Sequence, residues 1–107
     1  MIKHTIVALA VLGFCAPAFA SKGDPGAGKA KAEVCKACHG EGGVSASPDF
    51  PKLAGQHADY LATALKHYKL GKRKNPIMGG QAANLSEKDM LDLAAYFSMQ
   101  SGLAVKY

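Results

Sequence analysis

Any fold of this chain has to accommodate the segment Cys35-Lys36-Ala37-Cys38-His39. Two cysteines separated by two residues and followed directly by a histidine are typical of a covalent attachment site for a c-type haem. In such a site each thiol adds to one vinyl group of the haem, and an imidazole nitrogen of the next residue can bind the iron. We therefore predict that Cys35 and Cys38 hold a haem c and that His39 is an axial iron ligand.

Other interpretations of the two cysteines have less support in the sequence. A zinc site would need two further thiolates or histidines at similar spacing, and the only other cysteine is Cys15, near the N-terminus. A thioredoxin-like redox pair would belong to an alternating strand–helix chain, and no good strand run is present. A disulfide between Cys35 and Cys38 would close a very small loop and stabilise little. Haem attachment is the favoured interpretation.

The first twenty residues are typical of a secretory signal peptide. Lys3 and His4 are followed by an apolar run over residues 5–14 and by a small-residue cleavage site, Ala18-Phe19-Ala20. The run is about half the roughly 20 residues that span a bilayer, which disfavours an uncleaved anchor. We expect cleavage after Ala20, a periplasmic domain over residues 21–107 and no stable membrane insertion. A lipoprotein cysteine at Cys15 is disfavoured because bulky Phe14 precedes it.

Helical patterns account for most of residues 21–107. A polar lead over residues 21–25, expected to be mobile, precedes a helix over residues 26–38 that is rich in Ala, Lys and Glu. A second helix is predicted over residues 57–70, with one apolar face made of Tyr60, Leu61, Ala64, Leu65 and Tyr68. A third begins at Ser86, with Asp89 in a capping-box position, and ends at Gly102. The expected class is all-α, with three to four helices around one covalently attached haem.

A second iron ligand is predicted at Met78. This methionine lies in a segment expected to be an irregular loop, flanked by Gly79, whereas most core methionines lie on a periodic helix face. With His39 it would complete His/Met ligation, which raises the reduction potential of a haem relative to His/His. His57 and His67 are weaker candidates, because both are expected at the surface or at a helix end.

The ring of a histidine ligand is usually oriented by a hydrogen bond from its second nitrogen. A backbone carbonyl in the loop after His39 is the expected acceptor for that N–H group. Pro51 is the first candidate to supply this carbonyl and Pro48 the second.

These motifs resemble the class I c-type cytochromes over nearly all of residues 24–101. The resemblance is carried by Cys35–His39, by Pro51-Lys52-Leu53-Ala54-Gly55-Gln56, by Met78, and by Leu85-Ser86 ahead of Asp92-Leu93-Ala94-Ala95-Tyr96-Phe97. It is strongest to the short bacterial periplasmic monohaem members and to one half of the tandem dihaem cytochromes c. It implies a small cytochrome c fold with His39 and Met78 on opposite sides of the iron. The first and last helices would cross where Gly28 or Ala32 meets Tyr96 or Phe97.

The chain departs from the dihaem pattern because it contains a single CxxCH motif. A dihaem protein would therefore require the association of two copies.

The expected function is that of a soluble periplasmic electron carrier and not of an enzyme, because both axial positions of the iron would be filled. The expected partners are redox proteins such as membrane cytochrome complexes, terminal oxidases or periplasmic reductases. The basic residues between Lys66 and Lys74 are either a docking patch for an acidic partner or a solvated surface. Nucleic-acid binding is not expected, because the chain is only mildly basic and lacks an aromatic-and-arginine surface pattern.

Two alternatives to a free electron carrier remain open. The chain could be the haem subunit of a larger periplasmic oxidoreductase, or a ligand-binding or sensory haem protein if Met78 is displaced.

Overall fold

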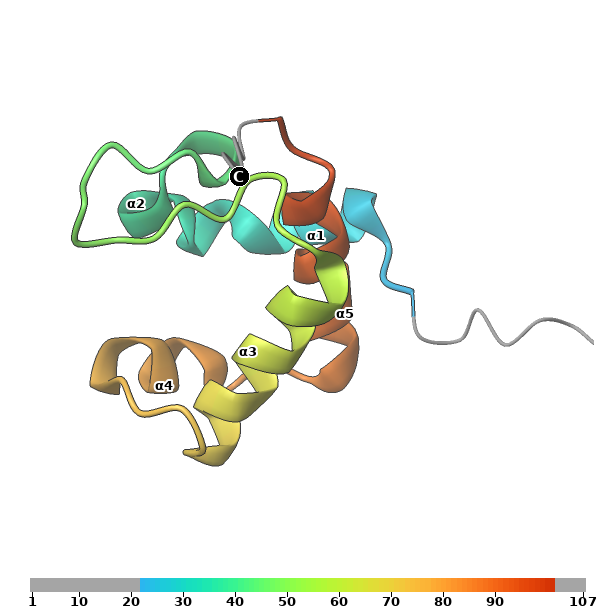
Figure 1. Ribbon diagram of the computed structural model, residues 1–107. Helices are drawn as coiled ribbons and strands as arrows, with labels where there is room; N and C mark the ends of the chain where they lie inside the picture. Colours follow the sequence, from blue (N-terminus) through green and yellow to red (C-terminus); the bar gives the residue numbers. More distant parts are fainter. Residues whose placement is uncertain (1–21, 102–107) are drawn as a thin grey trace, which may run out of the picture.

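The computed structural model describes residues 22–101, which form helices and loops without a strand among them (Figure 1). The α-helices within this range are α1 (Pro25–Lys31), α2 (Lys36–His39), α3 (Ala58–Leu70), α4 (Pro76–Ala82) and α5 (Glu87–Ser98). Two short 3₁₀ turns, η1 (Ala32–Val34) and η2 (Glu41–Gly43), flank α2. The predicted all-α class is confirmed. The predicted signal peptide over residues 1–20 lies outside the described residues.

The helix predicted over residues 26–38 is not continuous. Asp24 caps its start, with the carboxylate accepting a hydrogen bond from the Gly26 N–H, and Pro25 occupies the first helical position. The tighter turn η1 then separates α1 from α2. As a result Ala32 packs in the hydrophobic core, whereas Cys35 and Cys38 face a cavity further along.

The segment around Met78 is a helix, and the expectation of an irregular loop is wrong. The side chain of Asn75 accepts hydrogen bonds from the backbone N–H groups of Ile77 and Met78 at 3.0 and 3.1 Å. Pro76 follows at the first helical position, where its missing N–H costs nothing. These two residues start α4 despite the glycines at positions 79 and 80.

Helix α5 begins as predicted and ends earlier. Ser86 and Asp89 form the expected capping box. The helix stops at Ser98, because the backbone N–H of Gln100 bonds to the Phe97 carbonyl and its side-chain amide bonds to the Tyr96 carbonyl. Gly102, the predicted end, lies outside the described residues.

Helices α1 and α5 pack closely at a position where α1 has no side chain. A Cβ atom built on Gly28 would lie 1.9 Å from the backbone oxygen of Asp92 and 2.8 Å from the Cβ of Tyr96. Only glycine permits this approach. The predicted crossing of the first and last helices, with Gly28 against Tyr96, is therefore confirmed.

The polar lead before α1 is docked on α5, contrary to the expected mobility. The backbone N–H of Asp24 donates to a carboxylate oxygen of Asp92 at 2.7 Å. The side chain of Asp92 is 1 % exposed and also accepts hydrogen bonds from Lys31 at 2.6 Å and Lys88 at 2.8 Å. This buried carboxylate joins the lead, α1 and α5.

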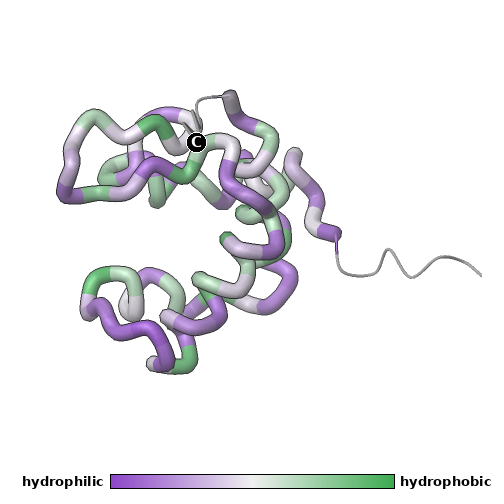
Figure 2. The backbone as a smooth tube through the Cα atoms, viewed as in Figure 1, coloured by the Kyte–Doolittle hydropathy of each residue, from purple (hydrophilic) through white to green (hydrophobic). Residues whose placement is uncertain are grey.

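Helices α2, α3, α4 and α5 contribute side chains to the wall of one cavity. Figure 1 shows α2 and the following loop on one side, α4 on the other, and α3 with α5 between them. Figure 2 shows that the loop between α3 and α4 is strongly hydrophilic. None of the helices between residues 22 and 101 has the length and apolar character needed to cross a membrane.

Candidate functional site

The cysteines and the histidine of the CxxCH segment are positioned by one helical turn. Cys35 precedes α2, and its carbonyl accepts hydrogen bonds from the backbone N–H groups of Cys38 and His39 at 3.3 and 2.9 Å. Gly40 then adopts a φ of +82°, and a Cβ there would lie 2.1 Å from the Val44 carbonyl oxygen. The chain can reverse directly after His39 because this position is glycine.

Both cysteine side chains line the cavity as free thiols. Partial burial, and secondarily the proximity of Cys38, raises the pKa of the Cys35 thiol above its ordinary value. No group of three or more His, Cys, Asp or Glu side chains within residues 22–101 is arranged to hold a metal ion. The further ligands that a zinc site would need are thus missing from the described part of the chain.

The imidazole of His39 is buried and held in one orientation. Its Nδ1 lies 2.8 Å from the carbonyl oxygen of Pro51, which confirms the first of the two predicted acceptors. Because a carbonyl can only accept, Nδ1 carries the proton and Nε2 is left with a free lone pair. The ring of Phe50 packs edge-on against the imidazole, with 6.5 Å between the centroids. His39 therefore has the tautomer and the support of a metal-binding histidine.

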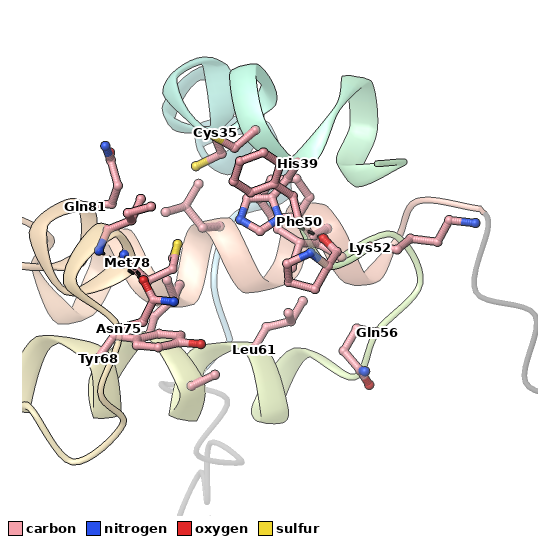
Figure 3. A pocket seen from close by; sticks show the side chains of 18 of the residues that line it. Cys35, His39, Phe50, Lys52, Gln56, Leu61, Tyr68, Asn75, Met78 and Gln81 are labelled. Atoms are coloured by element: carbon pink, nitrogen blue, oxygen red, sulfur yellow. Dashed lines mark hydrogen bonds between the residues drawn. The ribbon is translucent and has the colours of Figure 1, made fainter. Parts of the chain in front are cut away.

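Met78 approaches the same cavity from the opposite side. In Figure 3 its side chain, carried by α4, and the ring of His39, carried by α2, point into one space. Cys35 and Cys38 line that space as well, so all four predicted site residues meet in one cavity. His57 and His67, the weaker candidates, do not line it.

The cavity has a volume of about 330 Å³, within the range of about 300–1,000 Å³ that is common for cofactor sites. The face of α3 predicted to be apolar forms one wall, and Leu93, Ala94 and Phe97 of α5 contribute to another. An apolar cavity with two thiols, one imidazole and one thioether fits a haem attached through CxxCH.

Several polar cavity residues could not be identified from the sequence. Tyr60 and Tyr68 followed the periodicity of an apolar face, but their hydroxyl groups give that wall polar atoms. Asn75 lies in the segment that the sequence predicts to be an irregular loop, and Arg73 belongs to the basic run between Lys66 and Lys74; both line the cavity. The spacing of Tyr60 and Tyr68 along the helix was the one available signal.

The chain is similar to known proteins over most of its length. Residues 24–100 match the family model of cytochrome c. Cytochrome c4 of Pseudomonas aeruginosa is 48 % identical over 100 residues, which are 94 % of this chain and 49 % of the relative. Cytochrome c-554(548) of Halomonas halodenitrificans is 43 % identical over 81 residues, which are 73 % of this chain and 98 % of the relative.

Among solved structures, reduced recombinant cytochrome c4 from Pseudomonas stutzeri superimposes with a TM-score of 0.72 and 46 % identity. The match covers 76 % of this chain and 47 % of that one. The chain thus spans about half the length of the cytochrome c4 proteins that it matches, and almost the whole of cytochrome c-554(548).

Proposed function

Because the chain belongs to the cytochrome c family, we propose that it is a periplasmic one-electron carrier whose haem is held by Cys35 and Cys38 and ligated by His39 and Met78. The cofactor of this family is haem c, covalently bound and containing iron. The observation that carries the proposal is the meeting of these four side chains in one largely apolar cavity. When bound, the haem supplies an iron centre that cycles between the ferric and ferrous states.

Contacts to other residues hold both proposed ligands in position. The Pro51 carbonyl keeps the Nδ1 proton of His39 in place and so aims Nε2 at the cavity. Asn75 caps the first turn of α4 and so fixes the backbone at Met78. Ligands held in this way move little when the charge of the iron changes, which favours fast electron transfer. With two protein ligands there is no open position for a substrate, which supports a carrier and not an enzyme.

The apolar walls of the cavity set the electrostatic surroundings of the iron. Leu61, Leu93 and Phe97 are buried side chains that line the cavity and make its wall apolar. A low-dielectric surrounding disfavours the more highly charged ferric form and raises the reduction potential. The proposed Met78 ligand would act in the same direction.

We also propose export to the periplasm with cleavage after Ala20, on the signal-like pattern of residues 1–20.

The proposed partners are redox proteins with an acidic docking surface. Lys66 and Lys69 on α3 and Lys72 and Lys74 in the next loop are exposed and would face such a partner. A Lys72→Glu variant should weaken the salt dependence of the reduction rate by an acidic partner. An unchanged salt dependence would remove this docking surface from the proposal.

Absorption spectra of the oxidised and reduced protein test the proposed ligands. The ferric protein should show the weak far-red band of methionine–iron bonding. A Met78→Ala variant should lose that band and bind carbon monoxide in the ferrous state. Met99→Ala is the matched control, because Met99 is 70 % exposed and does not line the cavity. Ready binding of carbon monoxide by the wild-type ferrous protein would contradict the carrier function and favour a ligand-binding haem protein.

A further inference from the structure

Phe50 and Pro51 are consecutive residues of the loop between η2 and α3, and both contact the imidazole of His39. Pro51 supplies the carbonyl oxygen that lies 2.8 Å from Nδ1. The ring of Phe50 lies 6.5 Å from the imidazole, measured between the ring centroids, and the two ring planes form an angle of 67°. Only the contact with Pro51 has a role in the proposed function.

The hydrogen bond to Pro51 leaves one motion of the imidazole weakly restrained. It fixes the tautomer of His39 and directs Nε2 into the cavity. A rotation of the imidazole about the line from Nε2 through the ring centre displaces Nδ1 little, because Nδ1 lies close to that line on the far side of the ring. A hydrogen bond to a carbonyl oxygen tolerates a broad range of angles. A neighbour packed beside the ring is therefore needed to resist this rotation.

The ring of Phe50 is such a neighbour. Its centroid distance and angle to the imidazole are those of an edge-to-face aromatic pair. A pair of this kind favours one arrangement by a factor of about two to ten. Of the aromatic rings within residues 22–101, that of Phe50 is the one paired with the imidazole. Figure 3 shows the two rings next to each other, across the cavity from Met78.

The backbone around Phe50 is itself held in place. The N–H of Phe50 donates to the Ser47 carbonyl at 3.3 Å. The N–H groups of Leu53 and Ala54 donate to the Gly43 carbonyl at 2.9 and 3.2 Å, which joins the end of the loop to its beginning. A proline at the next position also narrows the backbone conformations open to Phe50. The half-buried ring of Phe50 is therefore carried by a restrained segment.

We propose that Phe50 is a positioning residue that holds the imidazole of His39 at one angle of rotation about the line through Nε2. The inference rests on the proposed haem site, because this angle has a consequence only if His39 binds the iron. The plane of the imidazole determines which iron d orbital overlaps with the π electrons of the ring. The splitting of these orbitals in the ferric protein therefore depends on the angle that Phe50 selects.

The experiment is electron paramagnetic resonance of the haem-loaded ferric protein, because the g values report this orbital splitting. Phe50→Leu keeps an apolar side chain and removes the aromatic ring. We expect it to shift the largest g value and to widen that signal, because the imidazole then adopts several angles. Phe50→Tyr retains the ring and should restore the g values of the wild type.

Tyr60→Leu is the matched control. It removes a ring that lines the same cavity and that forms no ring pair with His39 among the described residues. Its g values should equal those of the wild type. Unchanged g values in Phe50→Leu, or an equal shift in Tyr60→Leu, would overturn the proposal.

A measurement on the wild type tests the contact without any substitution. In the proton NMR spectrum of the ferrous protein, nuclear Overhauser effects should connect the ring protons of Phe50 with the imidazole protons of His39. Their absence would overturn the proposal, even if Phe50→Leu bound too little haem for its g values to be measured.

The far-red methionine band and the covalent haem content, measured on the same samples, test the proposed function separately. Wild-type values of both with unshifted g values in Phe50→Leu would overturn the inference alone. Absence of covalent haem from the wild-type chain would overturn the proposed function.

Discussion

At the scale of single residues, Asp92 is the charged side chain whose removal should matter most for stability. It is 1 % exposed and accepts hydrogen bonds from the Asp24 N–H and from two lysines. Without it, a backbone donor is left unpaired at the surface of α5 and the lead before α1 loses its attachment. Nothing in the sequence pattern marks Asp92 as buried, because two of its three partners, the Asp24 N–H and Lys31, are 68 and 61 residues away along the chain.

Asp92→Ala should lower the urea concentration at the midpoint of unfolding. This decrease in the midpoint should exceed the decrease caused by Lys88→Ala. The side chain of Lys88 is 71 % exposed, and its removal takes away one donor without leaving a buried group unpaired. Asp59→Ala serves as a surface control, since Asp59 is exposed and its carboxylate accepts a hydrogen bond from the adjacent backbone N–H of Tyr60. A midpoint for Asp92→Ala equal to that of Asp59→Ala would show that the buried carboxylate does not hold the helices together.

The neighbouring Asp89 gives stability a dependence on low pH. The Lys31 ammonium first, and then the backbone and hydroxyl of Ser86, lower the pKa of Asp89 from 3.8 to about 2. A carboxyl group whose pKa is lower in the folded than in the unfolded state stabilises the fold fully above the unfolded value. That stabilisation is lost as the pH falls from about 3.8 through about 2. Asp92, whose pKa is lowered by Lys31 and Lys88, acts in the same direction.

Thermal unfolding measured between pH 5 and pH 2 should therefore show a falling transition temperature. In a Lys31→Met variant the decline should be shallower, because the principal cause of both lowered pKa values is gone. Equal slopes for the wild type and Lys31→Met would mean that groups other than Asp89 and Asp92 cause the acid dependence.

At the scale of secondary-structure elements, the contact between α1 and α5 has no room for a side chain at position 28. Gly28→Ala places a methyl group against the Asp92 carbonyl, and neither backbone can yield without moving a helix. We expect a loss of about 2 kcal/mol or more in the free energy of unfolding. Gly80→Ala is the matched control in α4, where a Cβ meets nothing within 4 Å, and it should gain about 0.5–1 kcal/mol. Urea denaturation of both variants checks the pair, and a stabilised Gly28→Ala would refute the tight crossing.

Some features of the helices could be predicted from residues that are close in the sequence. The capping box at Ser86 and the periodic apolar face of residues 60–68 were correct from the sequence, because both depend on neighbours within one or two turns. The loop predicted around Met78 is a helix, because the Asn75 cap and Pro76 start α4 although Gly79 and Gly80 have low helix propensity. The α1–α2 break was also missed, because it depends on where the core and the cavity lie relative to one helix.

At the scale of the whole molecule, the cavity is large for a chain of this size. A domain of this length buries only a modest hydrophobic core of its own, and a bound haem would cover the apolar side chains of α3 and α5 that line the cavity. The total stability of a small domain is only about 5–15 kcal/mol. The haem is therefore expected to be part of the hydrophobic core and not an addition to a finished fold.

A Cys35→Ala/Cys38→Ala double variant should lack covalent haem and lose most of its helical circular dichroism signal. The single variant Cys35→Ala, which keeps one proposed attachment point, should be intermediate in haem content and stability. Mass spectrometry and circular dichroism on the same samples check both quantities. A double variant with the helical signal and cooperative unfolding of the wild type would show that the helices form a stable core without the cofactor.

The sequence alone predicts the cofactor chemistry of this protein, because that chemistry depends on local spacing. CxxCH needs one helical turn, and this motif with Met78 predicts the cofactor and its ligands. The helical class is predicted from the periodicity of the other segments, and the family match agrees with the cofactor and the fold. The tertiary structure decided which distant groups meet: Pro51 with His39, Asp92 with the lead before α1, and Arg73 with the cavity. These contacts join residues that local periodicity does not connect. They form only when the helices pack, and packing depends on the volumes and charges of the whole chain.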